Sequence, residues 1–307
     1  MRDEPNLFYR KLSRMLIACL LVLILSFGET TYTDIQYSRY PWYFESLKVR
    51  SLREREPKQQ VTVAIADSGL SENALPYFEY QPAFYDAVND EYASFSDPTG
   101  HGTEMAMLIA SNSKKKCSEY GISPKVHLLI VKVEDEHGVT TTDYLHSGLS
   151  FLLTQDIDII NISLGTKKSN EIIEDDLRKL YEKGCFIHCA AGDDSGSFAF
   201  PASSEYTFAI QTQDIDSQMD SFSNSSDSKP GILCPGQDIP VIVWNRAGEK
   251  ILVERTGSSF ACAIFSGYLS LLLESRVVEN DSFSPATLVD RIDKQSLYDE
   301  AGFLSLI

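Results

Sequence analysis

Basic residues are scarce in this chain of 307 residues: 27 lysines and arginines stand against 44 aspartates and glutamates, a formal net charge of −17. A nucleic-acid-binding protein normally presents a basic face, so this balance argues against nucleic acid as a partner. The carboxylates are spread through the chain, which predicts a solvated surface rather than an acidic binding patch. Internal repeats and low-complexity tracts are also absent, and an apolar content of 43% is that of an ordinary globular protein.

Long hydrophobic runs are equally few, and one stands out, at Met15 to Phe27. Basic residues precede it, so the positive-inside rule places the chain after this run on the outer side of a membrane. The run is shorter than the about 20 apolar residues of a comfortable spanning helix, and Ser26 and Gly28 could form a cleavage site. Residues 1–28 are therefore predicted to be a retained membrane anchor, a cleaved signal or, as a third interpretation, a buried helix. The first two place the protein at the cell membrane or make it secreted.

Cysteine is infrequent too, with six residues, of which five come after the hydrophobic run. An odd number cannot pair completely within one chain, and the spacing matches no disulfide framework. Cys185 and Cys189 flank His188 on a predicted strand, where neighbouring side chains point to opposite faces, whereas a zinc site needs converging ligands. We therefore expect no metal site, and buried free thiols at Cys117, Cys185, Cys189, Cys234 and Cys262.

The rest of the chain alternates short apolar runs with helical patterns. Strands are expected at 61–66, 126–133, 158–163, 185–191 and 207–212, and helices at 142–154, 171–183 and 259–275. This alternation indicates βαβ units, hence an α/β three-layer sandwich with a central, mostly parallel sheet. The sandwich is assigned to residues 61–307. Residues 29–60 show no apolar period and are predicted to be a stalk or lead-in.

Three polar residues stand at positions where catalysis is expected. Asp67 directly follows the first strand, at the sheet edge where parallel sheets carry their sites. His101 lies between two glycines at the start of a helical pattern, open to a carboxylate and to a nucleophile. Ser259 opens the long helix, where its hydroxyl meets the positive end of the dipole and its backbone N–H is free. Each has an ordinary structural explanation, such as a helix N-cap, but together they supply nucleophile, base and orienting carboxylate.

The segments Asp67-Ser-Gly, His101-Gly-Thr and Gly257-Ser-Ser-Phe-Ala resemble the three active-site signatures of the subtilisin-like serine proteases, the subtilases. They occur in that family's chain order of Asp, His and Ser, and the resemblance runs from about Val61 to Leu273. It implies that Asp67, His101 and Ser259 form a catalytic triad. It also implies a peptide or protein as substrate.

Further segments carry the same resemblance and imply substrate contacts. The segment Asn161-Ile-Ser-Leu-Gly is similar to the family's edge strand, which implies that Ser163, Leu164 and Gly165 pair with an extended substrate. The segment Ala190-Ala-Gly-Asp-Asp-Ser is similar to the oxyanion segment, which implies contacts at Ala191 and Gly192.

Among the positions that depart from the family's pattern, two carry an acidic side chain. Asp193 stands where the family normally has an asparagine that donates to the oxyanion together with the Ser259 backbone. An ionised Asp193 would bring negative charge to that point, and loss of this donor in subtilisin costs roughly 10²–10³ in kcat. A protonated Asp193 could still donate, because a desolvated site raises the pKa of a carboxyl. Glu104 replaces a common histidine and is expected to be exposed.

Many relatives of this kind bind calcium in a long loop, expected here between Ala110 and Gly121. The lysines of this segment are poor cation ligands, so calcium stays open without support from the sequence, and no other cofactor is expected. We predict a serine endopeptidase that hydrolyses peptide bonds through an acyl-enzyme on Ser259 and processes an exported peptide or protein. The alternative is a weak or silent pseudoprotease that binds peptides in the retained groove. Retention of all three triad residues favours the enzyme.

Overall fold

The computed structural model describes residues 41–92, 94–112, 121–245, 248–275, 283–293, 297–298 and 304–305. The hydrophobic run near the start, Cys19 and Cys117 lie outside these described residues. Most of the segment considered for calcium, at 113–120, also lies outside them.

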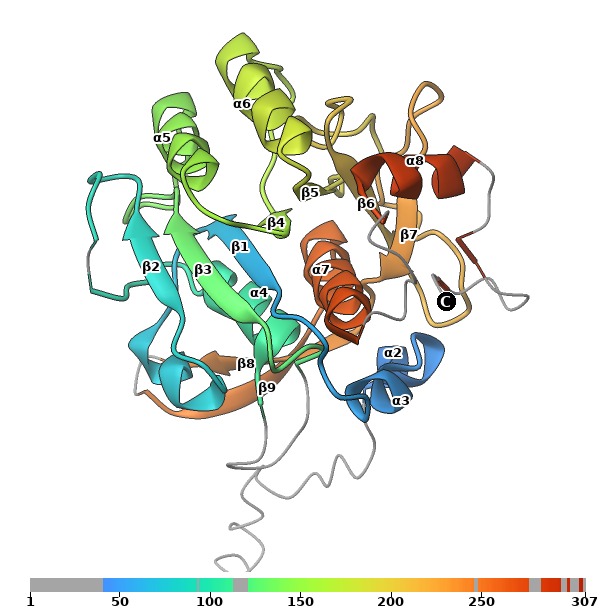
Figure 1. Ribbon diagram of the computed structural model, residues 1–307, viewed down its shortest axis with the longest axis horizontal. Coiled ribbons are helices and arrows are strands. Elements are labelled where there is room, and N and C mark those ends of the chain that lie inside the picture. The colour runs from blue at the N-terminus through green and yellow to red at the C-terminus, as the bar shows by residue number, and fades with distance from the viewer. Residues whose placement is uncertain are drawn as a thin grey trace, which may run out of the picture. The chain divides into compact units, whose positions relative to one another are not determined.

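One sheet of seven strands forms the centre of the protein (Figure 1). All of its strand pairings are parallel, which confirms the predicted parallel sheet. In spatial order the strands are β2 (Ala83–Asp86), β3 (His127–Lys132), β1 (Thr62–Asp67), β4 (Ile159–Ile162), β5 (Phe186–Ala190), β6 (Phe208–Gln213) and β7 (Ile232–Pro235). Because β1 pairs with β3 on one side and β4 on the other, the winding direction reverses at β1. Ligand sites of such sheets lie at this reversal, beyond the carboxyl ends of the strands.

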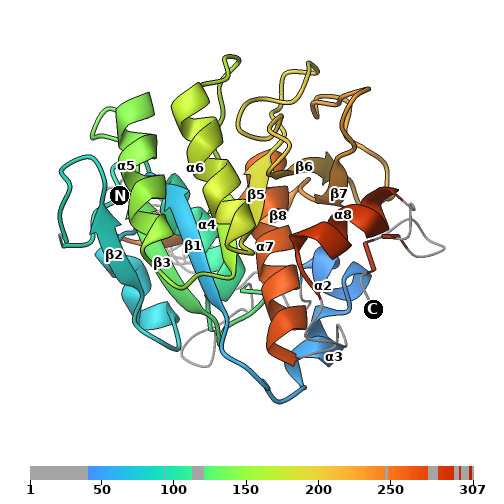
Figure 2. The same ribbon diagram turned by 45° about the horizontal axis from the view of Figure 1, so that its top comes forward.

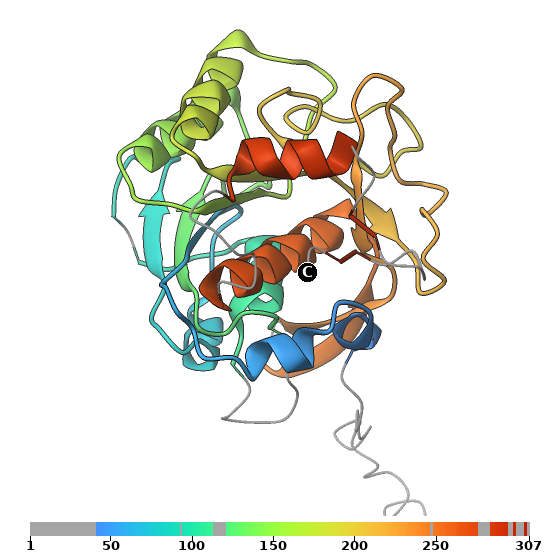
Figure 3. The same cartoon turned by 45° about the vertical axis from the view of Figure 1, so that its right-hand side comes forward.

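Helices cover both faces of the sheet, which confirms the predicted three layers (Figure 2). On one face, α5 (Thr142–Leu153) and α6 (Glu171–Glu182) pack leucines onto the sheet. On the other face, α4 (His101–Ala110) and α7 (Ser258–Ser275) belong to a second, larger apolar cluster. The helix α8 (Pro285–Asp293) adds Leu288 to that cluster (Figure 3).

The local sequence explains where the predicted helices begin and end. The Asn170 side chain accepts hydrogen bonds from the backbone N–H groups of Ile172 and Ile173, which caps α6. Gly184, with a φ of 93°, comes after the helix in the left-handed conformation that ends helices. The predicted boundaries therefore agree with the structure to within a residue or two.

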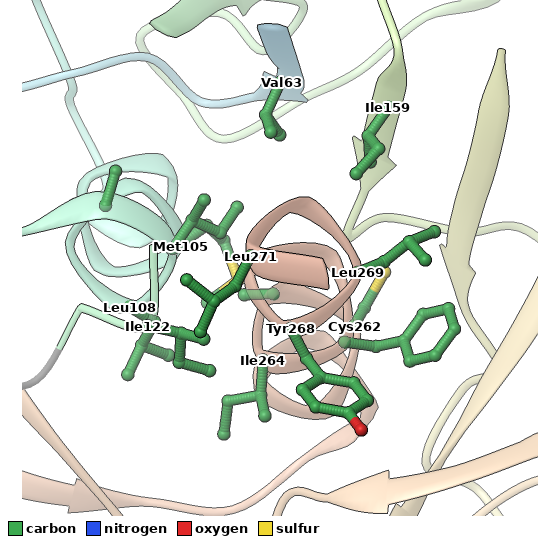
Figure 4. Packing of buried hydrophobic residues seen from close by; sticks show 14 of the residues in the cluster. Val63, Met105, Leu108, Ile122, Ile159, Cys262, Ile264, Tyr268, Leu269 and Leu271 are labelled. Atoms are coloured by element: carbon green, nitrogen blue, oxygen red, sulfur yellow. The ribbon is translucent and has the colours of Figure 1, made fainter. Parts of the chain in front are cut away.

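The helix α7 lies at the centre of the larger cluster, with Ile264 and Tyr268 packed among side chains from α4 and the sheet (Figure 4). A Cβ added at Gly267 would lie 3.0 Å from Cβ of Ile122 and 3.4 Å from the backbone of Ile109, so a small residue is needed here. Among the described residues, α7 is the one helix whose length and mean hydropathy of 1.2 would suit a membrane span, but 94% of it is buried inside the protein. Its apolar character is that of a core helix.

Residues 29–60 are predicted to be a stalk or a short lead-in to the domain, and the part that the structure describes packs onto the core. Residues 42–53 form two short helices, α2 (Trp42–Ser46) and α3 (Val49–Arg53). Their buried apolar side chains are at most 1% exposed and belong to the core around α7. The folded unit thus begins well before the predicted boundary at residue 61.

Two strands outside the main sheet were not expected from the sequence. They are β8 (Ile239–Trp244) and β9 (Lys250–Arg255), which pair antiparallel. β8 packs against α4, and β9 leads directly into Gly257 and α7. The hairpin therefore connects the helix that starts with His101 to the helix that carries Ser259.

Candidate active site

The predicted catalytic residues come together at the carboxyl edge of the sheet. Asp67 is the last residue of β1, and Ser163 directly follows the neighbouring strand β4. His101 is the first residue of α4, and Ser259 is the second residue of α7. Because α4 and α7 pack side by side, their amino-terminal ends meet above this edge.

Asp67 and His101 form a hydrogen bond of 2.8 Å between Oδ1 and Nδ1. Asp67 is 3% exposed, and its Oδ1 also accepts a hydrogen bond of 2.8 Å from the backbone N–H of Ser68. Within the described chain its other oxygen, Oδ2, is buried without a hydrogen-bond partner. The carboxylate is thus held in one orientation by the backbone and directed at a single ring nitrogen.

A second aspartate, which the sequence analysis missed, fixes the start of α4. Asp97 Oδ2 accepts hydrogen bonds of 2.8 Å from Thr103 N and 2.5 Å from Thr103 Oγ1. Its Oδ1 accepts hydrogen bonds from Gly100 N and from the Ser68 hydroxyl, each of 2.8 Å. The sequence signal for this role is an aspartate four residues before His101, because aspartate is favoured at the start of a helix.

Negative charges surround the His101 ring. Burial disfavours the charged imidazolium, but the charges of Asp67, Glu104 and Asp97 outweigh it and raise the pKa of His101 to about 9. Glu104 was expected to be exposed, and that expectation is wrong: it is 7% exposed. Arg255 on β9 pairs with both of its carboxylate oxygens, at 3.1 Å and 3.3 Å, which makes the burial of this charge tolerable.

Ser259 forms reciprocal hydrogen bonds with Ser163. Its Oγ donates to the Ser163 carbonyl at 3.1 Å, and the Ser163 hydroxyl donates to the Ser259 carbonyl at 3.2 Å. In this conformation the Ser259 hydroxyl therefore bonds to Ser163, directly after β4, rather than to His101. The ring of His101 nevertheless lies close by, 6.2 Å from the ring of Phe260 between centroids.

Asp193 is turned toward the start of α7. Its carboxylate accepts hydrogen bonds of 2.9 Å and 3.1 Å from Ser258 N and of 3.1 Å from the Ser258 hydroxyl. Burial raises the pKa of the Asp193 carboxyl, although the hydrogen bonds from Ser258 oppose this. In this conformation Asp193 thus acts as a hydrogen-bond acceptor that caps the start of α7. The backbone N–H of Ser259 makes no hydrogen bond to any of the residues described, which leaves it free to bind an anion.

A cavity of about 350 Å³ lies beside Asp193. Gly165 and Gly192, two of the predicted substrate contacts, belong to its lining. The Ala199 methyl, also in the lining, lies close to both glycines, since a Cβ at Gly165 or Gly192 would lie 2.9 Å or 3.5 Å from it. A salt bridge of 2.9 Å between Lys167 and Asp194 joins two other residues of the lining.

The remaining predicted substrate contacts have other neighbours. Ser163 is bound to Ser259, and Leu164 packs half-buried against the core beneath α5 and α6. Ala191 is buried, its N–H donates to Ile210 and its carbonyl accepts from Ala199. The backbone N–H and carbonyl of Ala191 thus already have partners within the protein, and its contact with a substrate stays a prediction.

A chain of buried hydrogen bonds that the sequence analysis did not anticipate leads from the core to Ser259. Ser266 Oγ donates to Asn161 Oδ1 at 3.0 Å, so His188 Nδ1 must be the donor in its 2.9 Å bond with Ser266. Asn161 donates in turn to Ser163 Oγ at 2.9 Å, which donates to the Ser259 carbonyl. His188 is fully buried, and burial lowers its pKa to about 3, so the ring is neutral. Each hydrogen bond in this series is donated in the direction that leads from His188 to Ser259.

The cysteines that the structure describes are buried free thiols, which confirms that part of the prediction. Cys185 and Cys189 face the layer of α5 and α6, whereas His188 contacts Phe265 of α7 on the opposite face. Across the described ranges, no group of three or more His, Cys, Asp or Glu side chains is placed to hold a metal ion.

Comparison with known proteins agrees with this geometry. The chain is 28% identical over 218 residues to the minor extracellular protease Epr of Bacillus subtilis (strain 168), which is 70% of this chain and 33% of that protein. It is 27% identical over 236 residues to the major intracellular serine protease of the same organism, or 73% of this chain and 71% of that one. The chain thus spans a third of the first relative's length and under three quarters of the second's.

A solved structure, that of the prenylagaramide maturation protease PagA, has a similar fold. It superposes with a TM-score of 0.64 over 83% of this chain and 88% of its own, at 24% identity. The profile of the Subtilase family matches residues 58–300. That match covers most of the sequence, including the elements that carry Asp67, His101 and Ser259. The chain belongs to the subtilase family of serine proteases.

Proposed function

We propose that this protein is a serine endopeptidase that hydrolyses peptide bonds through an acyl-enzyme on Ser259. The observation that carries the proposal is the 2.8 Å hydrogen bond between Asp67 and His101, beside the helix end that presents Ser259. His101 acts as the general base, and Asp67 orients the ring and stabilises the imidazolium. Family membership supports a peptide or protein as the substrate.

The hydrogen bond from Nδ1 to Asp67 leaves the Nε2 lone pair of His101 to accept a proton. In the resting conformation Ser259 Oγ donates to the Ser163 carbonyl, so rotation about one side-chain bond must bring it to His101. The oxygen then attacks the substrate carbonyl, and His101 passes the proton to the leaving amine. A water molecule releases the acyl group by the same route in reverse.

Two groups are proposed to stabilise the oxyanion. The first is the backbone N–H of Ser259, which is free at the positive end of α7. The second is Asp193, which donates only when its carboxyl is protonated, and its raised pKa supports that state. Since His101 must be neutral to act as base and its pKa is about 9, loss of its proton is expected to produce the rising limb of kcat/KM, whereas ionisation of Asp193 opposes it at higher pH.

Substrate binding is proposed along Ser163 to Gly165, by pairing with an extended peptide. The cavity lined by Gly165 and Gly192 would take one substrate side chain beside the cleaved bond. An added side chain at either glycine would disturb this lining, since a Cβ at Gly165 would lie 2.9 Å from the Ala199 methyl and one at Gly192 would lie 2.4 Å from the Asn224 amide nitrogen.

We further propose that the substrate is an exported peptide or protein and that residues 1–28 bind or cross a membrane. The hydrophobic run from Met15 to Phe27 behind basic residues supports this. The relatives are named for both extracellular and intracellular locations, so their names do not decide it. Fractionation of cells that express the Ser259→Ala chain, followed by protease treatment of intact cells, tests this location.

A fluorophosphonate probe, which reacts with an activated serine, tests the activity. Labelling of the purified protein should become faster from about pH 5 to about pH 9, as His101 loses its proton, and Ser259→Ala should abolish it. Ser228→Ala is a control, because it removes an exposed hydroxyl, 3.1 Å from that of Ser226, that has no part in the proposed site. A folded protein that stays unlabelled throughout would refute the enzyme and favour the peptide-binding pseudoprotease.

A further inference from the structure

A lysine side chain is inserted into a turn behind the cavity wall. The Lys229 ammonium donates hydrogen bonds to the carbonyls of Ala202 and Ser204, the first at 2.6 Å. A third hydrogen bond, of 3.2 Å, goes to the Thr207 hydroxyl. All three protons of the ammonium thus have oxygen partners, and all three partners come from residues 202–207.

This half-buried lysine differs from Lys132, a lysine of the described chain that is 6% exposed. Lys132 faces the carboxylate of Asp86 at 3.8 Å. No carboxylate of the described residues comes within 4.0 Å of the Lys229 ammonium, and Glu174 touches only the Ser204 hydroxyl, at 2.8 Å. The Cys189 thiol nearby supplies no charge, since burial raises its pKa to about 12. Neutral oxygens, rather than a counterion, therefore hold this cation.

The turn itself explains why a cation is needed. The Thr207 hydroxyl donates its own proton to the Pro201 carbonyl at 2.8 Å, so only its lone pairs face the ammonium. Two carbonyl dipoles and a hydroxyl oxygen from one short segment thus converge on one buried point. Oxygens arranged in this way are the ligands that proteins offer to hard cations. Without the ammonium, these oxygen dipoles would repel one another and lose three hydrogen bonds.

We propose that Lys229 is a built-in cation for the turn at 201–207, which occupies a place that would otherwise bind a free monovalent cation. The chain supplies the positive charge itself and so needs no metal ion to hold this turn. Truncation of the side chain should convert the turn into a binding site for an alkylammonium, ammonium or potassium ion.

The position of the turn gives the lysine a link to the cavity. Phe200, directly before the turn, pairs with Thr166 through two hydrogen bonds of 2.7 Å. Ala199 donates to the Ala191 carbonyl at 2.9 Å and belongs to the lining of the cavity, beside Gly165 and Gly192. The built-in cation therefore fixes the segment that continues into the cavity wall.

The test compares the thermal unfolding of Lys229→Ala with that of the parent protein. Both carry Ser259→Ala, which removes self-cleavage. Burial lowers the pKa of Lys229 to about 8, so the ammonium is charged at the neutral pH of the experiment. We expect the truncation to lower Tm by about 5 °C or more, because three oxygens lose their donor. Propylammonium has the atoms that the truncation removes, and it should restore at least half of the loss. Ammonium and potassium should restore a smaller part, and tetramethylammonium at equal ionic strength none.

Two variants control for charge and for volume. Lys229→Met fills the space of the stem without a charge, so it should be destabilised and show no rescue by any cation. Lys183 donates to the carbonyls of Leu153 and Gln155 at 2.8 Å and 2.9 Å but is exposed, so Lys183→Ala should change Tm little and show no rescue. The parent protein should keep its Tm in every salt and with a chelator.

The proposal is wrong if propylammonium stabilises Lys229→Ala no more than tetramethylammonium does, or stabilises the two control variants equally. A Lys229→Ala chain that cannot be obtained folded in propylammonium also counts against it. A second measurement, which rests on the proposed peptidase function, uses an active Ser259 chain: Lys229→Ala should raise KM more than it lowers kcat, and propylammonium should reverse this. If the protein hydrolyses no peptide at all, the proposed function is contradicted. The role of Lys229 is then judged by the Tm comparison alone.

Discussion

The ion pair between Glu104 and Arg255 is predicted to set the pH at which the site works. Glu104 lies one helical turn after His101 on α4, and its charge is among those that raise the pKa of His101 to about 9. In Glu104→Gln a negative charge is removed and the positive charge of Arg255 is left unopposed. Both changes disfavour the imidazolium, so the pKa of His101 should fall.

The size of the effect can be worked out from Coulomb's law. Two charges about 6 Å apart, at an effective dielectric constant of about 40, interact by about 1.4 kcal/mol, or about one pKa unit. Arg255 already cancels part of this charge, with contacts of 3.1 Å and 3.3 Å. We therefore expect the acid limb of kcat/KM in Glu104→Gln to move down by about 0.5–1 unit. Arg255→Gln leaves the negative charge of Glu104 unopposed and should move the limb up by a similar amount.

The assay is the pH profile of kcat/KM on a peptide amide substrate, with the rate of fluorophosphonate labelling as an independent profile. Glu182→Gln is the matched control, because it breaks an exposed ion pair with Arg178 on α6, in the layer across the sheet. Its profile should equal that of the parent. Shifts of Glu104→Gln and Arg255→Gln in the same direction, or of less than about 0.2 units, would refute the reasoning.

Three further changes have defined outcomes. Asp193→Asn should raise kcat near neutral pH and flatten the alkaline side of the profile, since an amide donates without needing a proton; an unchanged kcat would mean that the oxyanion is stabilised by other groups. Ser266→Ala interrupts the buried chain at Asn161 and should lower kcat at constant KM, with a loss of about 1–3 kcal/mol in urea unfolding; an unaltered kcat would show that the chain does not position the nucleophile. His146→Ala removes the partner of the buried Asp176, which lies 2.6 Å away, and should destabilise the protein by about 2 kcal/mol. This loss is smaller than for a fully buried pair because His146 is half exposed, and His146→Gln should recover part of it.

The elements that carry the triad could be predicted because their signals are local. The run that ends at Asp67 is apolar without interruption, and Ser259 opens a helix of small residues, so each position can be inferred from its immediate neighbours. By contrast, α2 and α3 are five residues each and lack side-chain caps. Lys48 between them adopts a left-handed φ of 53°, which breaks any helical period. Their burial depends on the distant core around α7.

The environment of the triad could not be predicted for a related reason. Glu104 and Arg255 are 151 residues apart in sequence, and only the β8–β9 hairpin brings them together. The orientation of Asp193 likewise depends on where α7 places Ser258. A residue type implies what a side chain can do, whereas its partner is decided by tertiary packing.

The four described cysteines have a practical consequence for monitoring how this fold opens. Burial raises the pKa of Cys185 to about 11 and that of Cys189 to about 12, and it raises the pKa values of Cys234 and Cys262 as well. Thiol reagents react with the thiolate, so none should modify the closed fold at an appreciable rate. Two of these thiols lie in the layer of α5 and α6 and two in the layer of α7. With Cys19 and Cys117 replaced by serine, the order of their alkylation would report whether the two layers separate from the sheet together or one after the other.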